Sequence, residues 1–232
     1  MSQLFRATFP SIFFLWALAG LLLNVQCQIL PEEVPRELQH LLNWDLDTWK
    51  PPEEIRKNFP YYLSGFDEEN RPIWVMEFGK WDIRSMLEKG PEWEKALDKH
   101  VDQLLWNFYN SSGIRSTHDF PVKEIETLVD AEGYQMRQLT HAPTVAFTIR
   151  KLRLIVIAMT FAHKVYFVNT SYIGERFLNI MRPVLGKEFE KFDIYGTNPK
   201  QWIPKLLKII PRDQLPPWYG GKPDFKPLKV YG

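Results

Sequence analysis

Residues 164–221 alternate short apolar runs with longer amphipathic segments. Residues 165–168 join β-branched and aromatic side chains without polar interruption, which predicts a buried strand. Residues 171–184 place apolar side chains at helical spacing, which predicts an amphipathic helix. Its apolar positions are Ile173, Phe177, Ile180, Met181 and Val184. A second short strand is predicted over residues 192–195, and a further amphipathic helix over residues 202–210.

The pattern upstream predicts two more strands and two long helices. A turn over residues 67–72 leads in hairpin-like fashion into a strand over residues 73–78, and another strand follows at residues 126–130. Apolar residues lie on one helical face from Pro91 to Phe108. Residues 143–161 form a helix that is apolar on most of its surface, which predicts burial on more than one side. Strands that alternate with long helices predict an α/β domain with a largely parallel sheet.

The N-terminus carries a hydrophobic leader. Arg6 precedes an apolar run over residues 11–25, and Cys27 follows as a small residue suited to cleavage. Residues 1–27 are therefore predicted to be a signal peptide that directs the chain into the secretory pathway or out of the cell. An uncleaved hydrophobic leader is the alternative. The protein would instead be cytoplasmic if this first segment is an error of the gene model.

Composition limits the functions to consider. With 232 residues, of which 45% are hydrophobic, the chain can bury one full core. The formal net charge of +1 gives no basic field for nucleic acid, so no nucleic-acid partner is predicted. Aromatic residues make up 15% of the chain, which suits a wide apolar cavity and an aromatic-rich core equally well.

Residues with catalytic chemistry are scattered along the chain. The five histidines never reach metal-ligand spacing, and Cys27 is the only cysteine. There is no GxSxG motif and no glycine-rich phosphate loop followed by a lysine. Asp130 and Glu132 are the best carboxylate pair, but no third group accompanies them. The sequence therefore predicts a protein that is not an enzyme and that uses no metal and no cofactor.

Several motifs carry a resemblance to a known family. They are WKPPEEI at residues 49–55, YYLSGFDEENRPIWVMEFGKWD at 61–82, LVDAEGYQMRQL at 128–139 and the LPPWYGG turn at 215–221. In this order they resemble the CRAL-TRIO lipid-binding domain family, which includes cellular retinaldehyde-binding protein, α-tocopherol transfer protein and phosphatidylinositol/phosphatidylcholine transfer proteins. The resemblance implies a mixed, largely parallel sheet that floors an apolar pocket, covered by helices that include a mobile gate helix.

The same resemblance implies a domain organisation. The lipid-binding domain is expected over residues 51–221, with a C-terminal tail over residues 222–232. Family members carry a larger helical lobe before this domain. Residues 28–50 are expected to be a short helical remnant of that lobe, because they hold only one amphipathic stretch.

The resemblance also assigns lipid-binding residues. The gate is expected at residues 171–184, with Gly174 as a hinge, so that its apolar side chains meet the ligand. Lys191 occupies the position of a lysine that meets the inositol phosphate in phosphatidylinositol-binding members, although a solvated charge explains it equally. The family's partner glutamate has no counterpart in residues 159–163. The expected lipid-binding residues are Trp106, Phe108, Tyr134, Gln135, Arg137, Ile173, Phe177, Ile180, Met181 and Lys191, with core packing as the alternative for Trp106 and Phe108.

The function implied is binding of a small hydrophobic molecule or phospholipid and its transfer between membranes through a gated apolar pocket. The expected partners are a phospholipid, tocopherol-like or retinoid-like ligand and, transiently, a membrane surface, for a protein that acts as a monomer. The alternative is a non-transporting membrane-docking or protein-interaction module whose pocket is open or collapsed.

Overall fold

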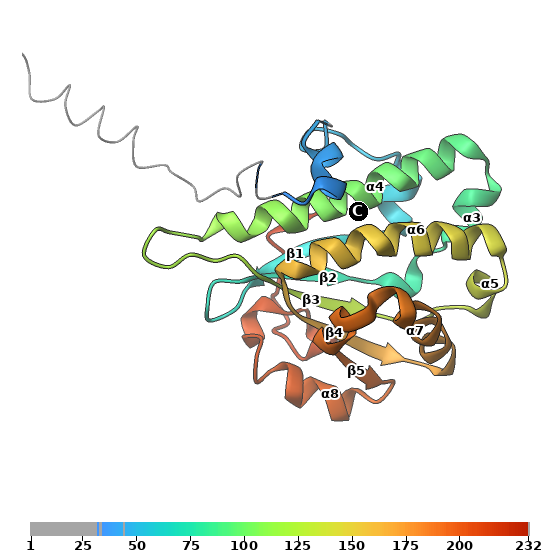
Figure 1. Ribbon diagram of the computed structural model, residues 1–232. Coiled ribbons are helices and arrows are strands. Elements are labelled where there is room, and N and C mark those ends of the chain that lie inside the picture. The colour runs from blue at the N-terminus through green and yellow to red at the C-terminus, as the bar shows by residue number, and fades with distance from the viewer. Residues whose placement is uncertain (1–31, 33, 44, 232) are drawn as a thin grey trace, which may run out of the picture.

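A six-stranded sheet organises the chain in the computed structural model, which describes residues 32, 34–43 and 45–231 (Figure 1). The predicted signal peptide at residues 1–27 lies outside the described residues. The strand order is β5-β4-β3-β2-β1-β6. The strands are β1 (Tyr61–Phe66), β2 (Pro72–Met76), β3 (Ile125–Asp130), β4 (Ala162–Thr170), β5 (Phe192–Gly196) and β6 (Lys229–Val230).

Strands β2, β3, β4 and β5 run parallel, while β1 is antiparallel to both β2 and β6. This confirms the predicted mixed, largely parallel sheet. The hairpin between β1 and β2 is closed by Asp67, whose carboxylate accepts hydrogen bonds from the backbone N–H of Glu69 at 3.0 Å and of Arg71 at 2.7 Å. Asn70 takes the left-handed conformation that the turn needs, with φ 62°.

Helices cover both faces of the sheet. The longer ones are α4 (Pro91–Ser111), α6 (Ala142–Ala158) and α7 (Tyr172–Leu185) on one face and α8 (Pro199–Leu206) on the other (Figure 1). The shorter helices are α2 (Glu53–Asn58), α3 (Ile83–Glu88) and α5 (Met136–Leu139). The 3-10 turns are η2 (Arg36–Asn43), η3 (Phe78–Lys80), η4 (Ser112–Ile114), η5 (Met159–Phe161), η6 (Gly186–Lys191), η7 (Arg212–Gln214) and η8 (Pro217–Tyr219). None of the described helices is both long and apolar enough to cross a lipid bilayer.

Two hydrophobic cores result from the alternation of side chains along each strand. Trp74 and Val129 point into the larger core, beneath α4, α6 and α7. Their neighbours Val75 and Leu128 point to the opposite face, into a smaller core covered by α8 and the LPPWYGG turn. Both central strands are therefore apolar on two faces, as expected of parallel strands in this class of fold.

The structure differs from the predicted pattern at the helix α6. It buries only Thr144, Phe147 and Lys151 of α6, so this helix is less covered than its apolar sequence predicts. The helix α6 lies in the outer layer, where α4 and α7 flank it and η2 also packs against it, so most of its side chains are only partly covered (Figure 1). The amphipathic stretch near the N-terminus forms the short 3-10 helix η2, and its Leu38 and Leu41 are buried in the larger core.

Candidate functional site

An apolar cavity of about 160 Å³ lies between the sheet and the helices α4, α6 and α7. Its floor is formed by side chains at alternate positions of two central strands, because every second residue of a strand points to the same face. These floor residues are Ile125, Thr127 and Val129 of β3 and Val165 and Phe167 of β4. The sheet therefore presents a continuous apolar surface to the cavity.

The helix α7 supplies one wall. Ser171 caps its N-terminus by accepting a hydrogen bond from the backbone N–H of Gly174 at 3.3 Å. Phe177, Met181 and Leu185 then recur every four residues and point into the cavity. The helix ends at Gly186, whose φ of 53° few residues other than glycine adopt readily.

The neighbouring helix α6 supplies the next wall with a similar spacing. Phe147, Lys151 and Ile155 recur every four residues, and Leu152 joins them in the lining. Across the cavity, α4 contributes Val101, Leu104, Leu105 and Phe108.

Among the described residues that line the cavity, Lys151 alone is charged, and its charge is already neutralised. Its Nζ lies 2.8 Å from Oδ1 of Asp102 and 2.9 Å from Oδ1 of Asp98, both on α4. The side chains of Lys151 and Asp102 are only 6% and 2% exposed. Burial raises the pKa of Asp102, while the attraction of Lys151 opposes that rise. The ion pair thus links α6 to α4 and leaves no uncompensated cation at the cavity.

The end of the cavity near the carboxyl ends of β2 and β3 is closed by aromatic rings. Phe78 stacks on Tyr134 with ring centroids 5.3 Å apart, and Phe177 of α7 lies 5.1 Å from Phe78 and 5.0 Å from Tyr134. Burial raises the pKa of the Tyr134 hydroxyl, so this ring is neutral. This ring cluster packs α7 against the segments that follow β2 and β3.

Comparison with known proteins identifies the family of this chain. The family description that matches residues 56–221 is that of the CRAL/TRIO domain. The chain belongs to the CRAL/TRIO domain family. It is 26% identical over 182 residues to the phosphatidylinositol/phosphatidylcholine transfer protein SFH14 of Arabidopsis thaliana, a match that covers 75% of this chain and 30% of that protein.

A second curated relative is Protein real-time of Drosophila pseudoobscura pseudoobscura, 29% identical over 102 residues, which cover 44% of this chain and 15% of that protein. The chain therefore spans less than a third of the length of either relative. The crystal structure of Sfh5 superimposes with a TM-score of 0.56 at 12% identity, covering 83% of this chain and 69% of that one. At that identity the superposition shows a shared fold alone.

Three of the ten residues predicted to bind lipid line the cavity of this CRAL/TRIO domain: Phe108, Phe177 and Met181. Tyr134 touches the lining through Phe78 and Phe177, and Ile173 packs against the same core. Their assignment as lipid-binding residues stays a prediction.

The other predicted apolar positions face elsewhere. Ile180 is 40% exposed on the outer side of α7. Trp106 points from α4 toward the N-terminal segment, where its indole N–H donates to Oδ1 of Asp47 at 2.8 Å. Gly174, the predicted hinge, is buried, and a Cβ there would lie 3.1 Å from Cγ2 of Thr170. Close packing explains this glycine, whereas Gly186 at the other end of α7 has open space around it.

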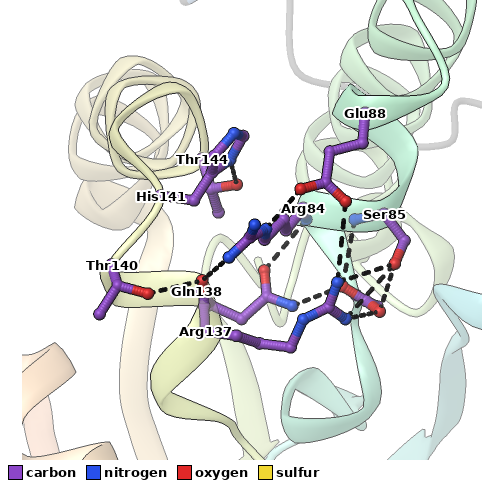
Figure 2. A network of polar contacts seen from close by, with 9 residues as sticks. Arg84, Ser85, Glu88, Arg137, Gln138, Thr140, His141 and Thr144 are labelled. Carbon is purple, nitrogen blue, oxygen red and sulfur yellow. Dashed lines mark hydrogen bonds and ion pairs between the residues drawn. The ribbon is translucent and has the colours of Figure 1, made fainter.

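Gln135 immediately precedes α5 and Arg137 lies on it, in a polar region outside the cavity. Figure 2 shows the contacts of Arg137. The guanidinium of Arg137 pairs with the carboxylate of Asp82 and lies 3.9 Å from Oε2 of Glu88. Although burial acts to raise it, the pKa of Asp82 is held below its usual range by hydrogen bonds, chiefly from Ser85 and then from Gln138 and Arg137. Arg137 therefore has a protein carboxylate as its partner, and the network joins α3 to α5.

Lys191 is likewise engaged within the protein. It is the last residue of η6, and its Nζ donates to the backbone carbonyl of Met159 and lies 3.1 Å from Oε2 of Glu188. Any contact with a phosphate would have to compete with these two partners.

Sequence reasoning missed the wall contributed by α6 and the floor contributed by β3 and β4. The sequence nevertheless contains a periodic pattern that indicates the helix wall and another that indicates the strand floor. Phe147, Lys151 and Ile155 share one helical face, and Thr127 and Val129 alternate with residues of the other sheet face.

Proposed function

We propose that this CRAL/TRIO domain binds one neutral hydrophobic molecule in the cavity beneath α6 and α7 and carries it between membranes. The observation that supports this best is the lining, which is apolar apart from a few polar side chains and contains one cation that is already paired. Apolar burial contributes about 25 cal/mol per Å², so a ligand that loses roughly 300 Å² of apolar surface gains about 7 kcal/mol before the cost of association.

The lining also favours one ligand class over another. A phosphate buried against it would find no free positive charge, and burying an unpaired charge is costly. The two side chains expected to meet a headgroup or an anion, Lys191 and Arg137, are engaged with protein carboxylates. A tocopherol-like or retinoid-like molecule therefore fits the site better than a phospholipid does.

Gating of the cavity follows from its size. Sites for small ligands usually measure about 300–1,000 Å³, whereas this cavity holds 160 Å³. The walls must therefore move outward when a ligand enters. The outer layer is the part suited to move, because α6 is only half-buried and α7 ends at Gly186 with φ 53°.

The carrier would act as a monomer that meets membranes transiently. If the predicted leader at residues 1–27 is functional, it would do so in the secretory pathway.

The alternative is an interaction module that carries no ligand. It is favoured by the apolar residues left exposed on α7, where Tyr172 is 63% exposed and Ile180 is 40% exposed. In that case the cavity would stay empty, and the outer face of α7 would be the functional surface.

Blocking the cavity distinguishes the two functions. Val129 lies on the cavity floor, and Val230 is 54% exposed on the edge strand β6. The Val129→Trp variant should lose transfer of a fluorescent neutral lipid between vesicles, while Val230→Trp should transfer as the wild type does. Circular dichroism checks that both variants fold. If Val129→Trp does not fold, the smaller change Thr127→Leu replaces it as the variant that blocks the cavity. Undiminished transfer by a folded, blocked variant would refute the proposed use of the cavity.

A further inference from the structure

Positive charge gathers in the segment that covers the second face of the sheet. Residues 199–226 contain six cationic side chains and two carboxylates, whereas the whole chain carries a formal net charge of only +1. All eight are exposed. The cations are Lys200, Lys205, Lys208, Arg212, Lys222 and Lys226, and the carboxylates are Asp213 and Asp224.

These residues belong to one continuous layer. Trp202 of α8 and Tyr219 of the LPPWYGG turn are each 1% exposed and share the smaller core, with ring centroids 6.2 Å apart. Gly220 lies so close to α8 that a Cβ there would come within 2.5 Å of Cγ2 of Ile203. In Figure 1 this layer runs in orange and red along the bottom of the molecule, away from α4 and α6.

The charges of this layer are uncompensated. Among the residues that the structure describes, no carboxylate lies within 4.0 Å of any of the six cations. Some lysines elsewhere are paired, since Lys151 meets Asp102 and Lys164 meets Asp193 at 3.2 Å. The ammonium of Lys205 lies 5.2 Å from the ring centroid of Tyr195. The layer therefore presents a positive field that the rest of the chain does not cancel.

The same layer exposes large apolar side chains. Trp218 is 60% exposed, although its neighbour Tyr219 is fully buried, and Ile209 is 38% exposed just after α8. Tryptophan is enriched at the interface between lipid and water, and exposed lysines attract the anionic headgroups of a bilayer. Interfaces between proteins are instead depleted in lysine. The combination of lysine with exposed tryptophan thus fits a lipid surface better than a protein partner.

We propose that α8 and the LPPWYGG turn form a docking surface for membranes that contain anionic lipids. The surface lies across the sheet from the apolar cavity, whose lining comes from the other face. It would hold the protein at a membrane independently of whether the cavity is filled. The proposal rests on the exposed cations and on Trp218. It does not depend on whether the cavity binds the proposed ligand.

Co-sedimentation of the full chain with vesicles tests this surface. The vesicles are made of phosphatidylcholine alone or of phosphatidylcholine with about 30% phosphatidylserine, at roughly 0.1 M and 0.5 M salt. The variant is the triple change Lys205→Glu, Lys208→Glu and Lys222→Glu. The matched control is Lys50→Glu, Lys57→Glu and Lys95→Glu, which changes the net charge equally at exposed lysines outside the layer.

The wild type should bind the anionic vesicles, and the binding should weaken at high salt. The triple variant in the layer should lower the partition coefficient on the order of 100-fold, while the control triple stays near the wild type. Trp218→Ser should also weaken binding without changing the net charge. Circular dichroism and the content of bound lipid verify that the variants are folded and loaded.

Three results would overturn the proposal: equal loss in both triples, loss in neither, or equal binding to vesicles of phosphatidylcholine alone. Binding to an acidic protein or RNA in place of anionic vesicles would replace the membrane with another partner.

Discussion

Replacing Lys151 with methionine removes a charged side chain from the cavity wall and leaves Asp102 without this partner. Asp102 is 2% exposed, and Nζ of Lys151 lies 2.8 Å from its Oδ1. Breaking a buried ion pair by removing one partner typically costs about 3–5 kcal/mol, because the remaining charge is buried and uncompensated. Burial already raises the pKa of Asp102, so protonation limits this cost and the lower end of the range applies.

The double variant Lys151→Met with Asp102→Leu should recover most of that loss. Replacing both partners of a buried pair with apolar side chains of similar volume is often neutral or stabilising by about 1–4 kcal/mol. Asp98 keeps its contact with Arg150, at 3.0 Å, and stays partly exposed, so it tolerates the loss of Lys151. The double-mutant cycle then isolates the energy of the pair.

Urea denaturation followed by circular dichroism measures the free energy of unfolding of all four proteins in this cycle. A Lys151→Met variant within about 1 kcal/mol of the wild type would refute the burial of this pair. Transfer of a neutral lipid should be unchanged in the double variant, because the cation has no part in holding the ligand. Loss of that transfer in a stable double variant would refute the assignment of a neutral ligand.

Three further predictions concern other buried groups. Burial lowers the pKa of His100 to about 4, below the roughly 6.5 of an unfolded chain. The unfolded state therefore binds the proton more readily, and up to about 3 kcal/mol of stability is lost as the pH falls from 6.5 through 4. Urea denaturation between pH 4 and 7 measures the free energy of unfolding as a function of pH. This free energy should depend less steeply on pH in His100→Gln than in the wild type. Tyr219→Phe removes the hydrogen bond that the hydroxyl donates to Oδ2 of Asp130 at 2.7 Å. In urea denaturation it should lower the free energy of unfolding by about 1.5–3 kcal/mol, and an unchanged value would contradict this hydrogen bond. Gly221→Ala should prevent a stable fold, because its Cβ would lie 1.6 Å from the carbonyl oxygen of Leu215; a normal melting temperature would contradict the close turn.

The sequence was sufficient for the four parallel strands and for the helix α7, because both depend on local periodicity. The run at residues 165–168 lies within β4, and the spacing of Phe177 and Met181 places both on the cavity. The two-residue strand β6 is too short to carry a pattern, and it forms because the C-terminal segment reaches the edge strand β1.

The partners of charged residues could not be predicted in the same way. Arg137 meets Asp82, which is 55 positions away in sequence, and Lys151 meets Asp102, which is 49 positions away. Such pairs depend on how distant helices pack, and periodicity contains no information about that. The direction of Trp106 is a similar case, since its partner Asp47 is 59 positions away in sequence.

The central claim is that the cavity holds a neutral hydrophobic molecule. The most direct test is to purify the full chain gently, extract it with organic solvent, and analyse the extract by mass spectrometry together with a phosphorus assay. We expect about one hydrophobic molecule per chain, without phosphorus. Recovery of a phospholipid at that ratio would contradict the ligand class, and recovery of nothing from a well-folded protein would contradict carriage itself.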